Sequence, residues 1–401
     1  MTIKVLHLST YDRGGGAGRA AQALHTAMLT RPLDSKLRTA HGPRFGSARF
    51  LERQLRKLQF SSNTTWRSPA RLASLLAKEI NASNADLVNL HWVTDGFLSI
   101  EEISQIEKPL VWSMYDMWPF MGTEHYGPDR SDARWRVGYT SDNRPVHESG
   151  VDLDKWTYQR KLRSWSNRSP IHMIPASTWL QETLQESALM SSWRNTRIPH
   201  VVSDQLFAPM DRREARQLLG IDGEFPAILF LASAGIHDHR KGFDLLERAI
   251  PIVQDRFPDI RIFIAGPPDP NYVSPSDANV IWLGELTGDD ELRSAYCAAD
   301  VVAIPSREDN MPLTAMEAQT CGRSVVAFGI GGLTDIVADQ ASGLLVETCN
   351  TADLGDALSI ALEDALGANR MGVVARERAL AIWSPRRVVS KYMELYESVL
   401  G

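Results

Sequence analysis

The sequence contains few cysteines, and their spacing argues against two kinds of stabilisation. Its 401 residues include three cysteines, Cys297, Cys321 and Cys349, an odd number without a CxxC pair. Disulfide-stabilised secreted domains carry a denser, even set, and many structural zinc sites use closely paired cysteines. We therefore expect neither a disulfide framework nor a zinc site, and we expect a reducing compartment.

Long apolar runs are also missing. The longest, AILFLASAGI at 227–236, covers about ten residues, whereas a helix that crosses a bilayer needs about 20. The first ten residues, MTIKVLHLST, form a β-rich run without the basic start and cleavage site of a secretory signal. These absences predict a cytoplasmic protein that at most touches the inner face of the cell membrane.

Charge is distributed unevenly. The net charge is −6, but residues 1–200 carry 26 lysines and arginines against 19 aspartates and glutamates. A basic half suits an anionic membrane face, and an ordinary solvated surface is the alternative. Within it, SARFLERQLRKLQF (47–60) predicts a basic amphipathic helix, which either lies on anionic lipid or packs one side against the protein. Its apolar residues are Phe50, Leu51, Leu55 and Leu58, and its basic ones are Arg49, Arg53, Arg56 and Lys57.

Short apolar runs alternate with helical patterns along the whole chain, which is typical of parallel sheets built from βαβ units. A proline-interrupted break at 198–220 separates two such series. We therefore predict an α/β fold of two doubly wound Rossmann-like domains, at 1–200 and 201–383. An amphipathic helix within 384–401 must dock on one of them. The predicted strands are 3–9, 86–92, 109–115, 172–177, 227–233, 260–266, 279–284, 300–306 and 324–329.

A glycine-rich turn, RGGGAGRAAQALHTAM (13–28), follows the first predicted strand. Its helix, expected to start near Ala17, would aim free N–H groups at a ligand close to Gly15 and Gly16. A dinucleotide site would need an acidic residue at the end of a second strand, but Asp34 precedes the apparent strand. An anion or substrate loop, a dinucleotide loop and a purely structural turn stay open.

The stretch PSREDNMPLTAMEAQTCG (305–322) combines a helix start with carboxylates, Asp309 and Glu317. Asp309 or Asn310 would cap the helix, and Pro312 suits its first turn. Amides at a helix start hold phosphate, whereas carboxylates accept hydrogen bonds from sugar hydroxyls, and a nucleotide sugar offers both groups. Arg240 and Lys241 would neutralise a diphosphate. Gly331 and Gly332, in GIGGLTDIV (329–337), form a further glycine loop at a strand end.

With these motifs assembled, the chain resembles a family 4 glycosyltransferase with the glycosyltransferase-B fold, similar to bacterial exopolysaccharide and colanic-acid enzymes. The resemblance implies transfer of a sugar from a nucleoside-diphosphate donor with retention at the anomeric carbon, and without a metal or other cofactor. It also implies a donor-binding second domain, an acceptor-binding first domain across a cleft, and a final helix that returns to the first domain. The stretches that carry it are HLSTYDRGGGAGRAA, NLHWVTDGFLS, KPLVWSMYDMWPFMGTEHY, RKGFDLL, DVVAIPSREDNMPLTAMEAQTCGRSVVAFGIGG and WSP…YMELYESVL.

By this resemblance Asp309 would contact the donor sugar, Glu317 the nucleotide ribose, and Lys241 the leaving group. Amides around Met311 to Leu313 would face the diphosphate, with Asn310 and Pro312 also at the substrate. Gly15 and Gly16 would abut the donor phosphates or the acceptor. The chain departs from the family pattern at several positions, so the transfer of roles stays an expectation. Asp309 replaces a glutamate beside Glu308, Arg240 would take the place of an arginine where Ile236 stands, and Tyr115-Asp116 replaces His-Asp. Asp116 is nevertheless predicted as catalytic, with Asp309, Lys241 and Arg240. His91 and His125 are the remaining candidates for the cleft, with structural roles as their alternative.

The expected partners are a nucleotide-sugar donor and a glycan, lipid-linked or small-molecule acceptor, with no nucleic acid. Assembly of a surface polysaccharide is the expected role. An inactive nucleotide-sugar-binding scaffold, a sugar-nucleotide epimerase of the same fold and a dehydrogenase are the alternatives.

Overall fold

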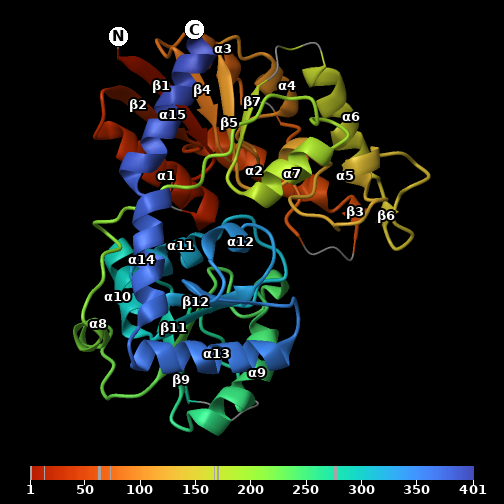
Figure 1. The fold of residues 1–401 in the computed structure, drawn as a ribbon. Helices are drawn as coiled ribbons and strands as arrows, with labels where there is room; N and C mark the ends of the chain where they lie inside the picture. The colour runs from red at the N-terminus through yellow and green to blue at the C-terminus, as the bar shows by residue number, and fades with distance from the viewer. Residues whose placement is uncertain are drawn as a thin grey trace. The chain divides into compact units, whose positions relative to one another are not determined.

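The chain divides into two compact units. The structure, a computed structural model, describes residues 2–12, 14–61, 65–72, 74–166, 168, 171–274 and 279–401. Unit 1 comprises Met1–Pro199 and Val389–Gly401, and unit 2 comprises His200–Val388 (Figure 1). The acceptor and donor roles of the two predicted domains stay predictions.

The described residues of unit 1 form a parallel sheet of five strands in the order β2-β1-β4-β5-β7. After β2 the chain crosses back and places β4 on the other side of β1. In open α/β sheets this reversal creates a crevice at the carboxyl ends of the two central strands, where ligands bind. The segments after β1 and β4 are therefore the first candidates for a site in unit 1. The strands are β1 (Ile3–Ser9), β2 (Leu33–Thr39), β4 (Leu87–Leu90), β5 (Leu110–Met114) and β7 (His172–Pro175).

Helices cover this sheet, and a short ribbon lies beside them. Central strand residues such as Val88, Leu90 and Trp112 are buried in an apolar core with residues of the surrounding helices. The helices are α1 (Gly15–Leu29), α2 (Pro43–Arg56), α3 (Leu76–Asn81), α4 (Ile100–Ser104), η1 (Trp118–Phe120), α5 (Arg134–Val137), α6 (Leu153–Trp165) and α7 (Thr178–Glu186). The ribbon pairs β3 (Gln59–Phe60) with β6 (Ser149–Gly150), antiparallel.

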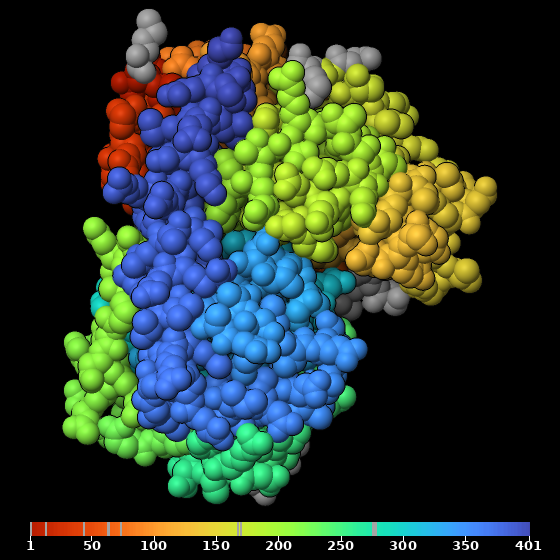
Figure 2. Space-filling view, viewed as in Figure 1, coloured from red at the N-terminus to blue at the C-terminus, as the bar shows by residue number. Residues whose placement is uncertain are grey.

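The segment 127–152 lies on the surface of unit 1, coloured gold in Figure 2. Two ion pairs lie within the segment, Arg134 with Asp152 at 2.7 Å and Arg136 with Asp129. A third joins Arg136 to Glu186 of α7, outside the segment. This connection is therefore tied to the body of the unit and carries β6 to its partner strand.

The described residues of unit 2 form a parallel sheet of six strands in the order β10-β9-β8-β11-β12-β13. From β8 the chain adds β9 and β10 on one side of the sheet and then crosses back to add β11, β12 and β13 on the other side. The parallel neighbours β8 and β11 are therefore the point at which the strand order reverses. The crevice for a ligand is therefore expected where β8 and β11 end. The strands are β8 (Ala227–Leu231), β9 (Arg261–Ala265), β10 (Asn279–Gly284), β11 (Val301–Ile304), β12 (Ser324–Phe328) and β13 (Gly343–Val346).

Two long helices of unit 2 pack closely together, as Figure 1 shows for α9 (Phe243–Arg256) and α13 (Thr351–Leu366). Gly355 permits this approach, because a Cβ there would lie 2.8 Å from Ile252 Cβ and 2.9 Å from the Ala249 carbonyl oxygen. A larger residue would push the two helices apart. The other helices are α8 (Arg212–Leu218), η2 (His239–Lys241), α10 (Asp289–Ala298), α11 (Leu313–Thr320), α12 (Leu333–Ile336) and α14 (Arg370–Ile382).

The last helix, α15 (Pro385–Leu400), begins in unit 2, and from Val389 onward it groups with unit 1. Two of its tyrosines reach the first sheet. Tyr396 accepts a hydrogen bond from Asn89 of β4 at 3.0 Å, and Tyr392 shares one with Ser113 of β5 at 2.9 Å. Both tyrosines are buried, so this end of α15 is part of the structure of unit 1.

Several local expectations were wrong. Asp34 lies inside β2, where it pairs in register with Lys4, and not ahead of the strand. β2 ends at Thr39, so the acidic residue that a dinucleotide site needs at the end of this strand is still missing. α1 begins at Gly15 instead of near Ala17. α2 ends at Arg56, and residues 59–60 of the predicted helix are strand β3. β13 had no strong apolar signal and was missed.

Candidate functional site

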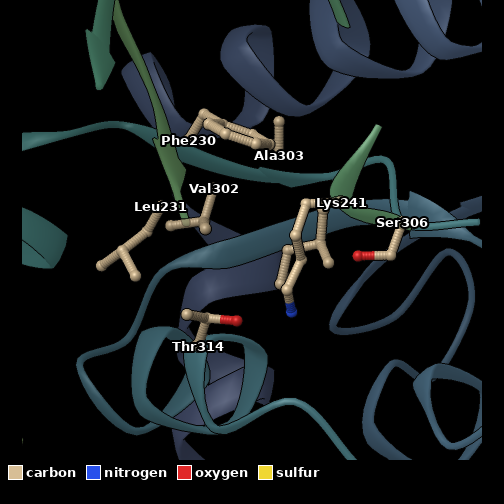
Figure 3. A pocket seen from close by; sticks show the side chains of 8 residues that line it. Phe230, Leu231, Lys241, Val302, Ala303, Ser306 and Thr314 are labelled. Atoms are coloured by element: carbon tan, nitrogen blue, oxygen red, sulfur yellow. The ribbon is translucent and has the colours of Figure 1, made fainter. Parts of the chain in front are cut away.

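The predicted donor residues of unit 2 gather where β8 and β11 end. Lys241, in η2, follows β8, while Ser306 and Asp309 follow β11 and Thr314 lies in the first turn of α11. Figure 3 shows the Lys241 amino group and the Thr314 hydroxyl pointing toward each other in a small pocket. The pocket is lined by Phe230, Leu231, Lys241, Val302, Ala303, Ile304, Ser306 and Thr314.

Asp309 is buried and paired with cations. Its Oδ2 accepts a hydrogen bond from Lys241 Nζ at 2.7 Å, and Arg240 Nη1 lies 3.5 Å from the same oxygen. Burial raises the pKa of Asp309, but the charges of Lys241 and Arg240 outweigh it and hold the pKa below 3.8, the ordinary value. Asp309 is therefore ionised at neutral pH, and the two cations that a diphosphate would need already share one carboxylate.

Glu308 faces a different environment from its neighbour. Its backbone carbonyl accepts a hydrogen bond from Arg240 Nη1 at 2.9 Å. Burial raises the pKa of its carboxyl group, and Arg240 lowers it only in part. The two adjacent acids thus have pKa values shifted in opposite directions, and Asp309 is the one held as an anion by direct ion pairs.

Two glycines allow the loops of this site to meet. Gly242 has φ +71°, and a Cβ there would lie 1.9 Å from the carbonyl oxygen of Pro305. Gly331 has φ +49°, and its Cβ would lie 1.9 Å from the carbonyl oxygen of Asp309. Gly332 N donates to that same oxygen at 3.4 Å. The predicted loop of Gly331 and Gly332 therefore supports the backbone of Asp309.

The start of α11 differs from the prediction that Asp309 or Asn310 caps it. The N-cap residue is Pro312, no side chain caps the helix, and α11 begins at Leu313. The carboxylate of Asp309 points to Lys241 instead, because the ion pair there is the stronger contact. The side chains of Asn310, Met311 and Leu313 are buried. A helix start without a side-chain cap keeps its first amides available to an anion.

Glu317 lies on α11 and is buried. Its Oε2 accepts a hydrogen bond from the hydroxyl of Tyr296, on α10, at 2.8 Å. Tyr296 is also fully buried, so this bond fixes the carboxylate on the inner side of the helix. An ionised carboxylate has further acceptor positions beyond this one bond.

His200, Ser306, Thr314 and Tyr296 belong to this region and were not among the predicted site residues. Burial lowers the pKa of His200 to about 4, while Asp309 raises it in part. His200 is therefore neutral near pH 7 and adds no charge beside Asp309. It lies in the segment that the sequence marked as a break between domains, where no motif identified it, whereas Ser306 and Thr314 stand within the quoted motif.

In unit 1 three rings form a hydrogen-bonded row across adjacent strands. His7 Nδ1 and His91 Nε2 lie 2.8 Å apart, and His91 Nδ1 lies 2.9 Å from the Tyr115 hydroxyl. Burial raises the pKa of Tyr115 well above its ordinary value, as do Tyr392 and Tyr396. Tyr115 therefore stays protonated and can donate a hydrogen bond, but it cannot act as a general base at neutral pH.

Asp116 and His125 form a second buried cluster. His125 Nδ1 lies 2.6 Å from Asp116 Oδ2, and His125 Nε2 lies 2.8 Å from Ser68 Oγ. Asp116 also accepts hydrogen bonds from the Trp118 amide and from Trp92 Nε1. Both nitrogens of His125 and both oxygens of Asp116 are thus engaged with the protein. Asp116, predicted as catalytic, has the contacts of a positioning residue. His91, Tyr115, Asp116 and His125 line one small pocket of unit 1.

The glycine turn after β1 is open. Gly15 has φ +69°, and neither Gly15 nor Gly16 has an atom within 4 Å of the position that a Cβ would take. Tyr11 packs against the turn: its ring lies 3.4 Å from the position that a Cβ would take at Gly14, and its Cβ and carbonyl oxygen lie 3.1 Å from that position at Gly18. The Tyr11 hydroxyl donates to Asp95 at 2.7 Å. Gly15 and Gly16 therefore leave space for a ligand beside the backbone. Arg13 lies outside the described residues.

Among the described residues, no group of three or more His, Cys, Asp or Glu side chains is arranged to hold a metal ion. In the stretch His237-Asp238-His239 the first two side chains have different partners. His237 Nε2 binds Asp269 at 2.9 Å, whereas Asp238 accepts from the Arg240 amide.

We expect the stability of the protein to depend on pH through His7. Burial lowers the pKa of His7 to about 3, from an ordinary value of 6.5, and His25 lowers it further. Between these values the unfolded chain binds a proton that the folded chain does not. The free energy of unfolding therefore falls as the pH falls, by about 1.4 kcal/mol per pH unit for this group. Urea unfolding between pH 7 and pH 4 should show a shallower dependence in His7→Gln. His147→Gln, at an exposed position, should match the wild type, and equal slopes in all three proteins would contradict this account.

The residues of unit 2 described above lie in a region with known relatives. Residues 226–364, about a third of the chain, match the family described as Glycosyl transferases group 1. A D-inositol 3-phosphate glycosyltransferase of Actinosynnema mirum is 36% identical over 195 residues, which cover 44% of this chain and 46% of that protein. The protein of that name in Saccharomonospora viridis is 35% identical, with 49% and 48% covered. This chain spans about half the length of the curated relatives it matches.

Solved structures share the fold across the whole chain. Sucrose-phosphate synthase from Thermosynechococcus elongatus matches with a TM-score of 0.68 at 17% identity, and 99% of both chains is covered. HepE from Anabaena, in complex with UDP-glucose, matches with a TM-score of 0.66 at 16% identity, covering 99% of this chain and 100% of that chain. The predicted α/β fold of the glycosyltransferase-B class, with two Rossmann-like halves, is confirmed.

Proposed function

We propose that this protein transfers a sugar from a nucleoside-diphosphate donor to an acceptor hydroxyl, and that unit 2 binds the donor. The observation that carries the proposal is that cations, carboxylates and a helix start lie together where β8 and β11 end. Lys241, paired with Asp309 at 2.7 Å, lies beside the uncapped start of α11, which also carries Glu317. Cations and free amides suit a diphosphate, and carboxylates suit the hydroxyls of the rings on either side of it.

In this proposal the donor exchanges one ion pair for another. The diphosphate takes Lys241 and Arg240 as partners and leaves Asp309 free to accept a hydrogen bond from the donor sugar. Glu317, held by Tyr296, accepts from the ribose. These carboxylates give a physical reason for acidic residues beside an anion site, because phosphate oxygens cannot donate to them.

The transfer step proceeds with retention. The bond from the anomeric carbon to the diphosphate oxygen breaks, the acceptor oxygen attacks from the same face, and its proton passes to the leaving diphosphate. Lys241, Arg240 and the α11 amides stabilise the negative charge that develops there, so the step needs neither a metal nor a protein base. A protonated Tyr115 in unit 1 is compatible with this scheme.

The solved complex of HepE with UDP-glucose makes UDP-glucose the first donor to test. The relatives named D-inositol 3-phosphate glycosyltransferase make a phosphorylated polyol the first acceptor. We further propose a role in surface polysaccharide assembly at the inner face of the membrane, with a glycan or lipid-linked acceptor among the candidates to screen.

We expect one nucleotide sugar to stabilise unit 2 against thermal unfolding when UDP-, GDP- and ADP-sugars are compared. A ligand at 100 times its dissociation constant stabilises by about 2.7 kcal/mol. With that donor, an acceptor screen should release free nucleotide only in the presence of the right acceptor. Binding without nucleotide release across the acceptor panel would replace the transferase with a nucleotide-sugar-binding scaffold. The absence of any stabilisation would overturn donor binding itself.

A further inference from the structure

Unit 1 exposes a set of large apolar side chains on α2 and β3, here called the α2–β3 face. Four residues define it: Phe50, Leu51, Leu58 and Phe60, with exposed fractions of 61%, 50%, 48% and 66%. Single exposed apolar residues are common on protein surfaces, but a group of them usually marks an interaction site.

Phe50 and Leu51 do not lie on the side of α2 that packs against the protein. The helix buries Phe45, Ala48 and Glu52 instead, and Glu52 accepts hydrogen bonds from the amides of Arg71 and Leu72 at 2.6 and 2.9 Å. The sequence left open whether the apolar residues of this helix pack against the core. For Phe50 and Leu51 the structure excludes that alternative.

The short strand β3 continues the exposed face. The Gln59 side chain points inward, where it donates to Asp154 at 2.6 Å and to Glu148 at 2.9 Å. Because side chains alternate along a strand, Phe60 points outward, and Leu58, in the turn between α2 and β3, is exposed as well. The amide of Val151 donates to the Leu58 carbonyl at 2.8 Å, and the half-exposed Val151 side chain extends the apolar area. The pairing of β3 with β6 thus holds Phe60 in place on the surface.

Charge on this segment has one sign. Residues 42–60 contain five basic residues and one acidic residue, the buried Glu52. Asp95 neutralises two of the five, since it binds Arg49 at 3.2 Å and Arg56 at 3.0 Å. Arg53 and Lys57 are exposed. The α2–β3 face therefore combines large apolar side chains with exposed cations and no exposed acidic residue of its own.

We propose that the α2–β3 face docks on an anionic lipid surface. Apolar side chains that enter the headgroup region and cations that meet lipid phosphates are the two contributions that bind amphipathic helices to membranes. Anionic lipid is favoured over a protein partner because the exposed charges of the segment, Arg53 and Lys57, have one sign. Docking would be peripheral: none of the helices in the described part of the chain has the length and apolarity needed to span a bilayer. The inference concerns unit 1 alone and does not depend on the donor proposed for unit 2.

Vesicle flotation of the full chain tests this docking. We expect the wild type to float with vesicles of phosphatidylcholine and phosphatidylglycerol and to stay behind with phosphatidylcholine alone. Arg53→Gln with Lys57→Gln should weaken binding by about fivefold for each cation removed, and added salt should weaken it further. Phe50→Ser with Phe60→Ser should abolish flotation, because it removes the two rings that would enter the headgroup region. The variant should still fold, because both rings are exposed to water and do not belong to the core.

A matched control is Leu218→Ser, which removes an apolar residue of 64% exposure from unit 2 and should float like the wild type. Equal recovery with both kinds of vesicle, no recovery with either, or unchanged flotation of both double variants would overturn the proposal. The same variants should bind the nucleotide sugar as the wild type does, which a thermal-shift assay would measure. A failure of membrane docking can thus be told apart from a failure of the proposed donor site.

Discussion

Replacing Lys241 with alanine is expected to lower kcat for sugar transfer by about 10²- to 10³-fold, the range found when one group that stabilises transition-state charge is removed. Lys241 is the only lysine in residues 200–388, and its amino group reaches Asp309 at 2.7 Å. Charge on the leaving diphosphate grows as the sugar departs, so a cation placed there acts mainly in the transition state. Steady-state kinetics with the donor varied would show a large loss in kcat with a smaller change in KM.

The control for this variant is Arg256→Ala, which removes a half-exposed cation on α9 whose ion pairs are 3.7 Å long. It should leave both constants unchanged. Lys241→Ala also leaves the buried Asp309 carboxylate without its closest partner, which destabilises the fold. Lys241→Ala with Asp309→Asn relieves that burden and serves as the control for folding. The loss in kcat is read from the single variant, because the double variant also removes the proposed sugar contact of Asp309. A higher KM with an unchanged kcat would mean that Lys241 only helps to bind the donor.

Asp309 also links this site to pH. Its lowered pKa means that the folded chain binds the carboxyl proton less readily than the unfolded chain does. The stability from the ion pair is therefore present above pH 3.8, the ordinary value, and is lost as the pH falls through the folded-state pKa. This dependence should disappear in the Lys241→Ala and Asp309→Asn double variant.

The strand pattern of the sequence was sufficient for the fold, because strands buried on both faces leave continuous apolar runs. The runs IKVLHLS and VVAI are clearly recognisable as strands in the sequence. β2 (LDSKLRT) and β13 (GLLV) are harder to recognise, because they lie at sheet edges, where polar residues or glycine are tolerated. The order of strands around β8 and β11 was not predicted from the sequence, and the structure shows that the two are neighbours. Placement of Lys241 close to Asp309 then follows, since both segments leave neighbouring strands at the same edge.

The details of the site depended on competition among contacts, which the motif does not encode. Asp309 was expected to cap α11, but a nearby lysine from another loop attracts its carboxylate more strongly than free amides do. Likewise, Phe50 and Leu51 were candidates for packing, but α2 packs through the side that carries Glu52, whose carboxylate accepts from two backbone amides. His200 and Tyr296 support the site from distant parts of the sequence, where neither spacing nor composition indicates them.

Replacing Glu317 with alanine is expected to raise the donor KM by about 10- to 100-fold, because a hydrogen bond to a charged group contributes about 1.5–3 kcal/mol. The carboxylate is buried, and the Tyr296 hydroxyl at 2.8 Å fixes its orientation. Ribose hydroxyls contact it equally in the ground and transition states, so kcat should change little. Tyr296→Phe removes only the positioning bond and should show a smaller rise in KM.

A nucleotide without ribose hydroxyls shows whether Glu317 acts by contacting the ribose or by supporting the packing of α11. The proposed contact runs from the ribose hydroxyls to Glu317, so Glu317→Ala should weaken binding of the ordinary nucleoside diphosphate but not of its 2′,3′-dideoxy analogue. The wild type should in turn bind the dideoxy analogue about as weakly as the variant does. This double comparison, measured by titration calorimetry, isolates one contact. Either change alone removes the contact between Glu317 and the ribose, so making both changes should cost no more than making one. An equal penalty for both nucleotides would show that Glu317 acts through the packing of α11 against Tyr296, and the ribose would then need a different partner.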